Sequence, residues 1–472
     1  MSIDDQVNSA LNLRHVASLW ALLLIVQPFF FTNSDLNAAE PETIETQSAV
    51  PPGFASRHDY MLLEANRQLQ SQEFADVEAN MRAYIKQIEA QDSRYALNLA
   101  TPLLMLGTAM ELQDDIIGAL EMYGRALHIQ RVNQGLHTIN QVTAVYKEAN
   151  ALVSIGDVIK ANEKQEYAYN ILRRSLGPLN IELLPGLYHL AEWYKKTNNI
   201  YSARGLYEHA KMLIVEDSSE TDTRLLKVYS GLADSYKLER FPPYHSAQSR
   251  NKGAFRISSN STNSPLALQE QPKVHRYSEG EQALQQIIRI MKASPDFNSG
   301  DTARAVVDLA DWNLLFDKPK RAGVLYRHSI DLINTAPEEN RGMYAELFSD
   351  PVQLYMPLPL DPKAPENATK QQALNGTVEI SYAIDARGHT RTVETLLSDP
   401  AGMMDIKVRR AVKMARFRPR LEDSLPVRTE DRFLKYEFTY YPAKPRNNAR
   451  LKRAAAIDTA PETDTDAEPS PE

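Results

Sequence analysis

Small and apolar positions in the middle of the chain recur every 42 residues. Ala119, Ala161 and Ala203 stand at this spacing, and a stripe with helical periodicity follows each of them. A second series of small residues begins twelve positions earlier, at Gly107, Ala149, Ala191 and Ala233. Apolar positions three or four apart share one face of a helix, so each period predicts a pair of helices. The small residues allow the paired helices to approach closely.

The C-terminal part of the chain shows a different pattern. Between Thr377 and Ile384 apolar and polar residues alternate, which predicts a strand with one buried face. Asp385 to Gly388 predict a tight turn, after which the strand resumes over residues 389–397. A helical stripe follows at Met404, Val408, Ala411, Val412 and Ala415. A last alternating run, with Leu434, Tyr436, Phe438 and Tyr440 on one face, completes a small α+β module over residues 375–441.

The 42-residue pattern resembles tetratricopeptide repeats with a longer loop. The resemblance implies about six helical pairs between residues 56 and 334, stacked into a solenoid whose first helices line a concave peptide groove. The family's groove positions fall here on Tyr146, Asn150, Tyr188, Glu192, Lys195, Ser230, Asp234 and Lys237. An ordinary solvated helix face carries the same mixture of side chains, and this alternative stays open.

The fourth repeat is interrupted. Its first helix is expected over residues 223–238 and its second only over residues 279–293. Residues 244–276 between them are rich in Ser, Asn, Gln and Pro, which bury too little apolar surface to offset the entropy of ordering, and they predict a disordered insertion. Trp193 and Trp312 adjoin small-residue positions and are expected between helices.

The C-terminal module resembles the C-terminal domain of the TonB family, periplasmic proteins that grip outer-membrane receptors. The residues that carry the resemblance are Gly376, the turn 384–388, Ser398, Ala411 and the run Phe417-Arg418-Pro419. It implies that an extended peptide binds by adding a strand to the sheet. The expected edge is Arg432 to Tyr440, with Arg432, Leu434, Tyr436, Phe438 and Tyr440 as its binding residues. The alternative is that these aromatic residues are core and that the edge pairs within a homodimer.

The flanking segments predict export and two regions without a core. Residues 1–39 contain the apolar run Val16 to Phe31, which is either a cleaved signal peptide or a retained membrane anchor. Residues 335–374 hold six prolines and predict a stiff extended linker between solenoid and module. Residues 442–472 contain a basic run followed by an acidic, proline-containing end, and they predict a disordered tail.

The composition of the chain limits the kinds of binding and catalytic site that it can contain. The 472 residues carry a net charge of −8, so no overall bias toward nucleic acid exists. The module is locally basic between residues 407 and 420, where a solvated helix face and a patch for an acidic partner are the two interpretations. The absence of cysteine excludes disulfides and thiolate metal sites. No catalytic motif, metal cluster or cofactor loop is evident in the sequence.

These features together predict a mainly α protein, a tetratricopeptide-like solenoid followed by a small α+β TonB-like domain. The expected function is that of a non-enzymatic periplasmic adaptor for envelope proteins or peptides, with an outer-membrane receptor as a candidate partner. Membrane contact is expected only through the N-terminal segment. The alternatives are a TonB-type energy transducer, anchored in the inner membrane, and an envelope assembly scaffold.

Overall fold

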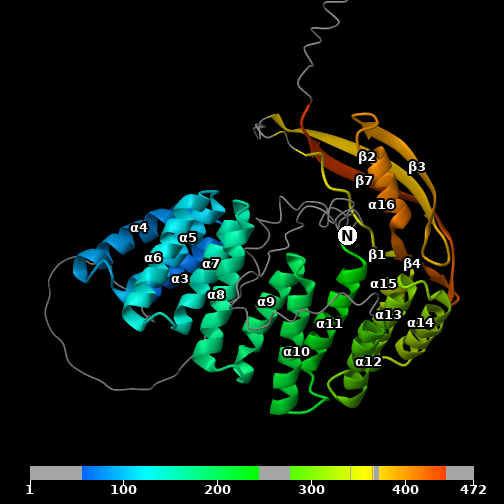
Figure 1. The fold of residues 1–472 in the computed structure, drawn as a ribbon, viewed down its shortest axis with the longest axis horizontal. Coiled ribbons are helices and arrows are strands. Elements are labelled where there is room, and N and C mark those ends of the chain that lie inside the picture. Colours follow the sequence, from blue (N-terminus) through cyan, green and yellow to red (C-terminus); the bar gives the residue numbers. More distant parts are fainter. Residues whose placement is uncertain (1–55, 244–276, 341, 364, 366–371, 443–472) are drawn as a thin grey trace, which may run out of the picture.

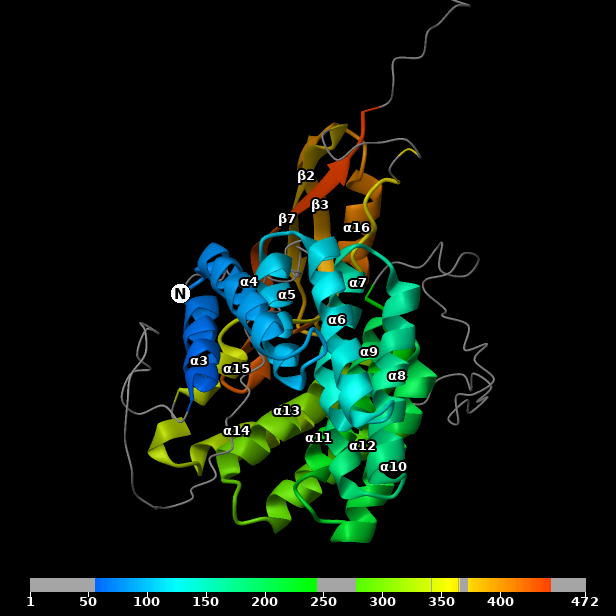
Figure 2. The same ribbon diagram turned by 90° about the vertical axis from the view of Figure 1, so that its left-hand side faces the viewer.

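The computed structural model describes residues 56–243, 277–340, 342–363, 365 and 372–442. Six antiparallel helical pairs follow one another along an arc, and a sheet with one helix lies at the C-terminal end of that arc (Figures 1 and 2). The pairs are α3 (Arg57–Gln70) with α4 (Phe74–Gln91), α5 (Ala100–Leu112) with α6 (Ile116–Gln134), α7 (Val142–Ser154) with α8 (Val158–Leu176), α9 (Leu184–Lys196) with α10 (Ile200–Asp217), α11 (Leu225–Arg240) with α12 (Tyr277–Ala293), and α13 (Ser299–Leu315) with α14 (Pro319–Asn334). The prediction of a helical-repeat solenoid is confirmed.

The 42-residue period is visible in the backbone itself. The 3₁₀ turns η2 (Leu97–Leu99), η3 (Ile139–Gln141) and η4 (Ile181–Leu183) precede the first helices of three successive repeats at that spacing. At the second helices, the side chains of Asp115 and Asp157 each accept a backbone N–H three residues on, which satisfies one of the free donors of the first turn. The acidic turn residues therefore serve as N-caps.

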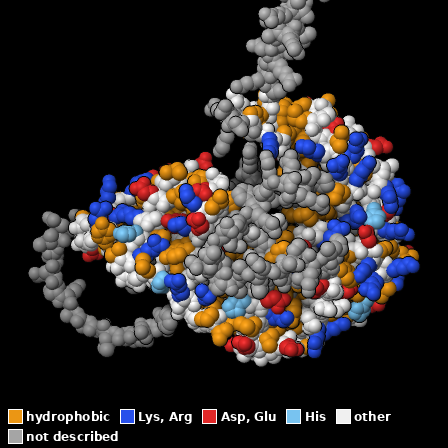
Figure 3. Space-filling view, in the orientation of Figure 1, with side chains coloured by type: hydrophobic (Ala, Val, Ile, Leu, Met, Phe, Trp, Pro, Cys, Tyr) orange, Lys and Arg blue, Asp and Glu red, His pale blue; other side chains and the backbone are white. Residues whose placement is uncertain are grey.

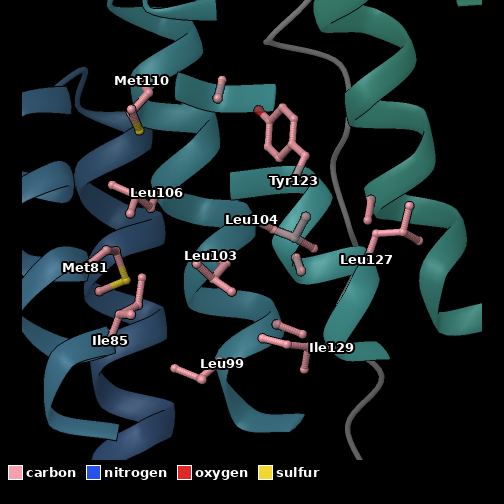
Figure 4. Packing of buried hydrophobic residues seen from close by; sticks show 14 of the residues in the cluster. Met81, Ile85, Leu99, Leu103, Leu104, Leu106, Met110, Tyr123, Leu127 and Ile129 are labelled. Carbon is pink, nitrogen blue, oxygen red and sulfur yellow. The ribbon is translucent and has the colours of Figure 1, made fainter. Parts of the chain in front are cut away.

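Small residues bring the two helices of a repeat together. Gly107 in α5 faces Tyr123 of α6, and a Cβ at this glycine would stand 2.5 Å from Cε1 of the tyrosine ring. Figure 4 shows Tyr123, Leu127 and Ile129 on one side of α5, with Met81 and Ile85 of α4 on the other. One hydrophobic cluster thus extends over α3 to α8 and is shared between neighbouring pairs.

The two tryptophans lie between helices, as their positions predict. Trp312 is 3% exposed, and a Cβ at Gly280 of α12 would stand 2.2 Å from its ring. Trp193 donates its indole N–H to Asn162 Oδ1 at 2.8 Å, from α9 to α8. α12 completes the interrupted repeat, the fifth of the six helical pairs, by packing on α11, although 36 positions separate the two helices in sequence. The segment 244–276 between them lies outside the described residues.

The C-terminal module is a three-stranded antiparallel sheet in the order β3-β2-β7. Its strands are β2 (Leu374–Ile384), β3 (Thr390–Asp399) and β7 (Thr429–Tyr440), and α16 (Asp405–Met414) packs on one face. The core between them contains Val378, Ile380, Val408, Val412, Leu434, Tyr436 and Phe438. The shorter strands are β4 (Arg416–Arg418), β5 (Leu421–Glu422) and β6 (Leu425–Pro426).

The predicted turn between β2 and β3 is present and has a clear physical basis. The carboxylate of Asp385 accepts the backbone N–H groups of Arg387 and His389, each at 2.9 Å. Gly388 follows with φ +77°, and its carbonyl accepts the N–H of Phe417 at 2.9 Å. A Cβ at Gly388 would stand 1.9 Å from the carbonyl oxygen of Phe417, so this turn requires glycine.

The prediction of an extended linker over residues 335–374 is wrong for much of its length. The segment contains η5 (Glu338–Asn340), α15 (Met343–Phe348) and the strand β1 (Val352–Tyr355), which pairs antiparallel with β4. Met343, Leu347 and Phe348 are buried in the core of the last repeat. The prolines fall outside α15 and β1, so the apolar residues between them fold into the body.

A buried ion pair joins the module to the solenoid. Arg418 of β4 donates from Nε to Asp311 Oδ1 at 3.0 Å and from Nη2 to Asp311 Oδ2 at 2.6 Å. Its third nitrogen donates to the carbonyl of Leu347 at 2.9 Å, and Tyr326 donates its hydroxyl to Asp311 at 2.7 Å. Arg418 and Asp311 are 6% and 8% exposed. A bidentate pair of this kind fixes the orientation as well as the position of the two parts.

The membrane prediction concerns residues outside this structure. No helix in the described residues is both long enough and apolar enough to cross a membrane. The apolar run Val16 to Phe31 and residues 443–472 of the predicted tail lie outside the described ranges.

We expect Arg418→Leu to lower the free energy of unfolding by about 3 kcal/mol, because Asp311 keeps its buried charge without a cation. Thermal denaturation followed by circular dichroism measures the change. Arg420→Leu is the matched control, since Arg420 pairs with the exposed Glu422 and should matter little. The double change Arg418→Leu/Asp311→Leu should recover part of the loss. An equal effect of the two single changes would contradict the role given to the buried pair.

Candidate peptide-binding surfaces

Strand β7 occupies one edge of the sheet. It pairs only with β2, through nine consecutive residue pairs from Leu374 opposite Tyr440 to Tyr382 opposite Arg432. No other described strand lies along its second side. A long, regular edge of this kind carries a row of backbone donors and acceptors that a further strand can use.

One hydrogen bond shows which residues of β7 direct their backbone N–H and C=O groups away from β2. The backbone N–H of Thr439 donates to the carboxylate of Asp361 at 3.1 Å, away from β2. Backbone direction alternates along an antiparallel strand, so the N–H and C=O groups of Phe433, Lys435 and Glu437 also point outward. None of these three has a backbone partner outside the sheet among the described residues. Their side chains are exposed, by 66% at Phe433, 59% at Lys435 and 67% at Glu437.

The residues predicted for this edge occupy the opposite positions in the alternation. Leu434, Tyr436 and Phe438 are 3–4% exposed and form the core, while their backbone groups face β2. Arg432 and Tyr440 are half-buried at the two ends of the paired stretch. The apolar stripe in the sequence identifies the strand and its buried face, but the groups available to a partner belong to the residues in between.

The opposite edge of the sheet is less suited to pairing. The register between β2 and β3 shifts at two places, between Glu379 and Ile380 and between Ser381 and Ala383. Thr392 in β3 has φ +47°, in the left-handed region. Bulges of this kind disturb the row of donors and acceptors and are a common protection of edge strands. β7 has its one register shift beyond the nine-pair stretch, near Asp431 with φ +53°, and is therefore the better template of the two.

The predicted groove positions lie on the first helices α7, α9 and α11. Lys195 of α9 joins Glu192 and Asp234, with Nζ 3.1 Å from a carboxylate oxygen of each, and so connects α9 to α11. The hydroxyl of Tyr207 donates to Glu192. Burial alone would raise the pKa of Glu192, but Tyr207 and the neighbouring lysines hold it below its usual range. Asn150, Ser230 and Asp234 are exposed, and Lys237 is half-buried.

Aromatic side chains on these helices are held by neighbours that the sequence pattern did not single out. The rings of Tyr146 and His189 stack with centroids 3.9 Å apart, and His189 is bonded to Gln165 at 2.9 Å. Lys227 places Nζ 4.4 Å from the ring centroid of Tyr188. The repeat could have indicated His189. This residue directly follows the groove position Tyr188, and it stands 42 positions after Lys147, which has the same place in the preceding repeat.

Lys147 of α7 is a further cation beside these helices, and it is half-buried. Its Nζ donates to Thr108 Oγ1 of α5 at 2.8 Å and lies 5.7 Å from the ring centroid of Tyr123. Burial lowers the pKa of Lys147, and the charge of Glu111 partly offsets that effect.

No group of three histidine, aspartate or glutamate side chains converges as metal ligands would in the described part of the chain.

Comparison with known proteins agrees with this division of the chain. Residues 362–439 match the family model described as the Gram-negative bacterial TonB protein C-terminal. This module is a TonB C-terminal domain. Its match begins at residue 362, thirteen residues before the boundary expected from the sequence, so it includes the segment directly after Asp361. No curated protein matches the chain.

Several solved structures resemble the fold of this chain over part of its length. A putative kinesin light chain of Podosopora anserina with nearly identical TPR-like repeats is 15% identical, with 51% of this chain and 97% of that chain covered and a TM-score of 0.37. BtubC (BKLC) from P. vanneervenii is 12% identical, with 67% and 100% covered and a TM-score of 0.37. NprR in complex with its cognate peptide NprX is 12% identical, with 62% and 72% covered and a TM-score of 0.29.

We expect amide hydrogen exchange to alternate along β7. The N–H groups of Leu434, Tyr436 and Phe438 point toward β2 and should exchange slowly, whereas those of Phe433, Lys435 and Glu437 should exchange at least about tenfold faster. Exchange measured by NMR on the isotopically labelled chain tests this. Equal protection of both sets in the free monomer would show that the outer side of β7 is already covered.

Proposed function

We propose that this protein is a non-enzymatic adaptor of the bacterial envelope that binds one polypeptide by strand addition to β7 and a second through the concave side of its solenoid. The outward backbone of Phe433, Lys435 and Glu437 is the observation that carries the proposal. A partner that aligns with this edge gains main-chain hydrogen bonds without any change in the fold of the module.

The edge supports a short incoming strand. Asp361 already binds the N–H of Thr439, so the open stretch runs from Phe433 to Glu437. Side chains of an added strand would meet Phe433, Lys435 and Glu437 on the solvent face, and Lys435 and Glu437 form an ion pair at 2.9 Å there. An exposed phenylalanine beside a charged pair favours a partner that alternates apolar and polar residues.

The concave side supports a second protein contact. Its charges are of both signs, and its Tyr146 and Tyr188 rings are held in place by His189 and Lys227. Rigid aromatic surfaces with adaptable polar neighbours are typical of peptide-binding sites. The family of the C-terminal domain and the apolar run Val16 to Phe31 support a place in the periplasm of a Gram-negative cell, with the run as a signal or an inner-membrane anchor.

We expect Lys435→Pro to weaken strand addition about tenfold, because proline removes one outward N–H and obstructs the neighbouring strand. Lys435→Ala removes the same side chain, keeps the N–H and should bind nearly normally. The measurement is the yield of adducts in cells from a photo-crosslinking amino acid at Phe433. Equal yields for the two variants would contradict strand addition, and adducts with a second copy of this chain would identify the homodimer instead.

The family match also favours a second candidate function, that of a TonB-type energy transducer. A transducer needs its membrane anchor, whereas an adaptor or an envelope assembly scaffold needs only export. Deletion of Val16 to Phe31, with another export signal supplied, should therefore abolish receptor-dependent uptake by a transducer. Unchanged uptake would exclude this candidate and leave the adaptor.

A further inference from the structure

One side of α16 presents cations and apolar residues together to solvent. We call it the α16 face, and it consists of Met403, Ile406, Lys407, Arg410, Lys413 and Met414. The three apolar side chains are 40%, 66% and 40% exposed. In Figure 3 lysine and arginine side chains gather over the C-terminal module in the upper right of the view. The opposite side of α16, with Val408 and Val412, is buried against the sheet.

The cations of the α16 face have no ion-pair partner among the described residues, in contrast to other cations of the module. Arg391 pairs with Asp385, Arg420 with Glu422, Arg428 with Glu430 and Lys435 with Glu437. Asp405, the acidic residue of α16 itself, is bound by the hydroxyl of Ser398. An unbalanced positive face with exposed apolar side chains favours an acidic segment that also carries apolar residues.

The same chain contains such a segment. Residues 458–472 carry six carboxylates and no lysine or arginine, and the apolar run Ala454 to Ile457 precedes them directly. From this complementarity we propose that residues 454–472 bind the α16 face of their own chain. The proposal is independent of strand addition, because it uses the helix rather than the edge of β7.

The tether is long enough for this contact. Tyr440 lies opposite Leu374, and Asp399 lies opposite Thr377, so β7 ends at the same end of the sheet from which the chain leads into α16. The residues between 442 and 458 span at most about 50 Å when extended. A tether of this kind gives an effective concentration on the order of millimolar, at which a weak charged contact is populated.

The basic run from Lys444 to Arg453 offers the carboxylates a second set of cations. The α16 face differs from it in two respects. Its cations stand at fixed positions on a folded helix, so less conformational entropy is lost on binding. It also presents Met403, Ile406 and Met414 to the apolar run Ala454 to Ile457. When bound, the segment would exclude other acidic or anionic partners from this face.

The absence of native cysteine permits a direct test in the full chain. Met403→Cys/Thr465→Cys keeps all six carboxylates and all cations, and Val324→Cys/Thr465→Cys is the matched control, because Val324 is 56% exposed on α14 in the solenoid. We expect disulfide formation within one chain, in dilute protein under mild oxidation, to be at least about tenfold greater for the first pair. Sodium chloride at about 0.5 M should reduce it toward the control.

Substitution of the cations separates the two candidate binding sites for the carboxylates. Lys407→Gln/Arg410→Gln/Lys413→Gln should abolish the excess crosslinking, whereas Lys444→Gln/Arg446→Gln/Lys452→Gln should leave it intact. Circular dichroism of each variant verifies the fold. Equal disulfide yields from the α16 pair and the solenoid control pair would overturn the proposal. So would a loss of crosslinking only with the substitutions at Lys444, Arg446 and Lys452, and so would disulfides that form only between chains.

A membrane surface is the competing occupant. If the segment covers the face, deletion of residues 458–472 should increase the binding of phosphatidylglycerol vesicles several-fold, since it uncovers the cations. Equal vesicle binding by the full chain and the shortened chain would show that the face is open in both, and would also overturn the proposal.

Discussion

The architecture depends on the buried contact of Arg418 with Asp311. A charge taken out of water is costly unless its partners are placed accurately, and here the carboxylate, the guanidinium, the Tyr326 hydroxyl and the carbonyl of Leu347 satisfy one another. The arrangement ties α13 of the last repeat to β4 of the TonB C-terminal domain. The pairing of β1 with β4 adds main-chain hydrogen bonds at the same place. The domain is therefore mounted on the solenoid in one orientation.

This mounting determines how the two proposed binding surfaces are placed relative to each other. A proline-rich spacer would let solenoid and module search independently for their partners, whereas a fixed joint holds the edge of β7 and the concave side in constant relation. Two polypeptides bound to these surfaces would be oriented relative to each other. Tension applied to a strand on β7 would also pass into the last repeat through β2, the turn that follows it and β4, because the carbonyl of Gly388 in that turn accepts the N–H of Phe417 in β4 and Arg418 of β4 binds Asp311.

Much of the fold is predictable because it repeats. The 42-residue spacing of Ala119, Ala161 and Ala203 correctly predicts the helical pairs, and period-two alternation predicts the strands of the module. The joint is not predictable in this way, because Arg418 and Asp311 are 107 positions apart and each is polar within its own element. The proline content of residues 335–374 led to the wrong prediction of an extended linker. In the structure the burial of Met343 and Phe348 outweighs the stiffness of the flanking prolines.

The candidate edge shows where a sequence pattern reaches its limit. An apolar stripe reports where side chains go, and Leu434, Tyr436 and Phe438 are indeed the residues of β7 that matter for stability. The backbone groups of alternate residues in β7 point to opposite sides of the strand. Which set faces a partner therefore depends on the side at which β2 pairs with β7, and only the three-dimensional structure shows that side. Because the backbone groups of Leu434, Tyr436 and Phe438 face β2, those of Phe433, Lys435 and Glu437 face outward, which is the basis of the binding role proposed for them. Their side chains are thus free to vary with the partner while the core that supports the edge stays unchanged.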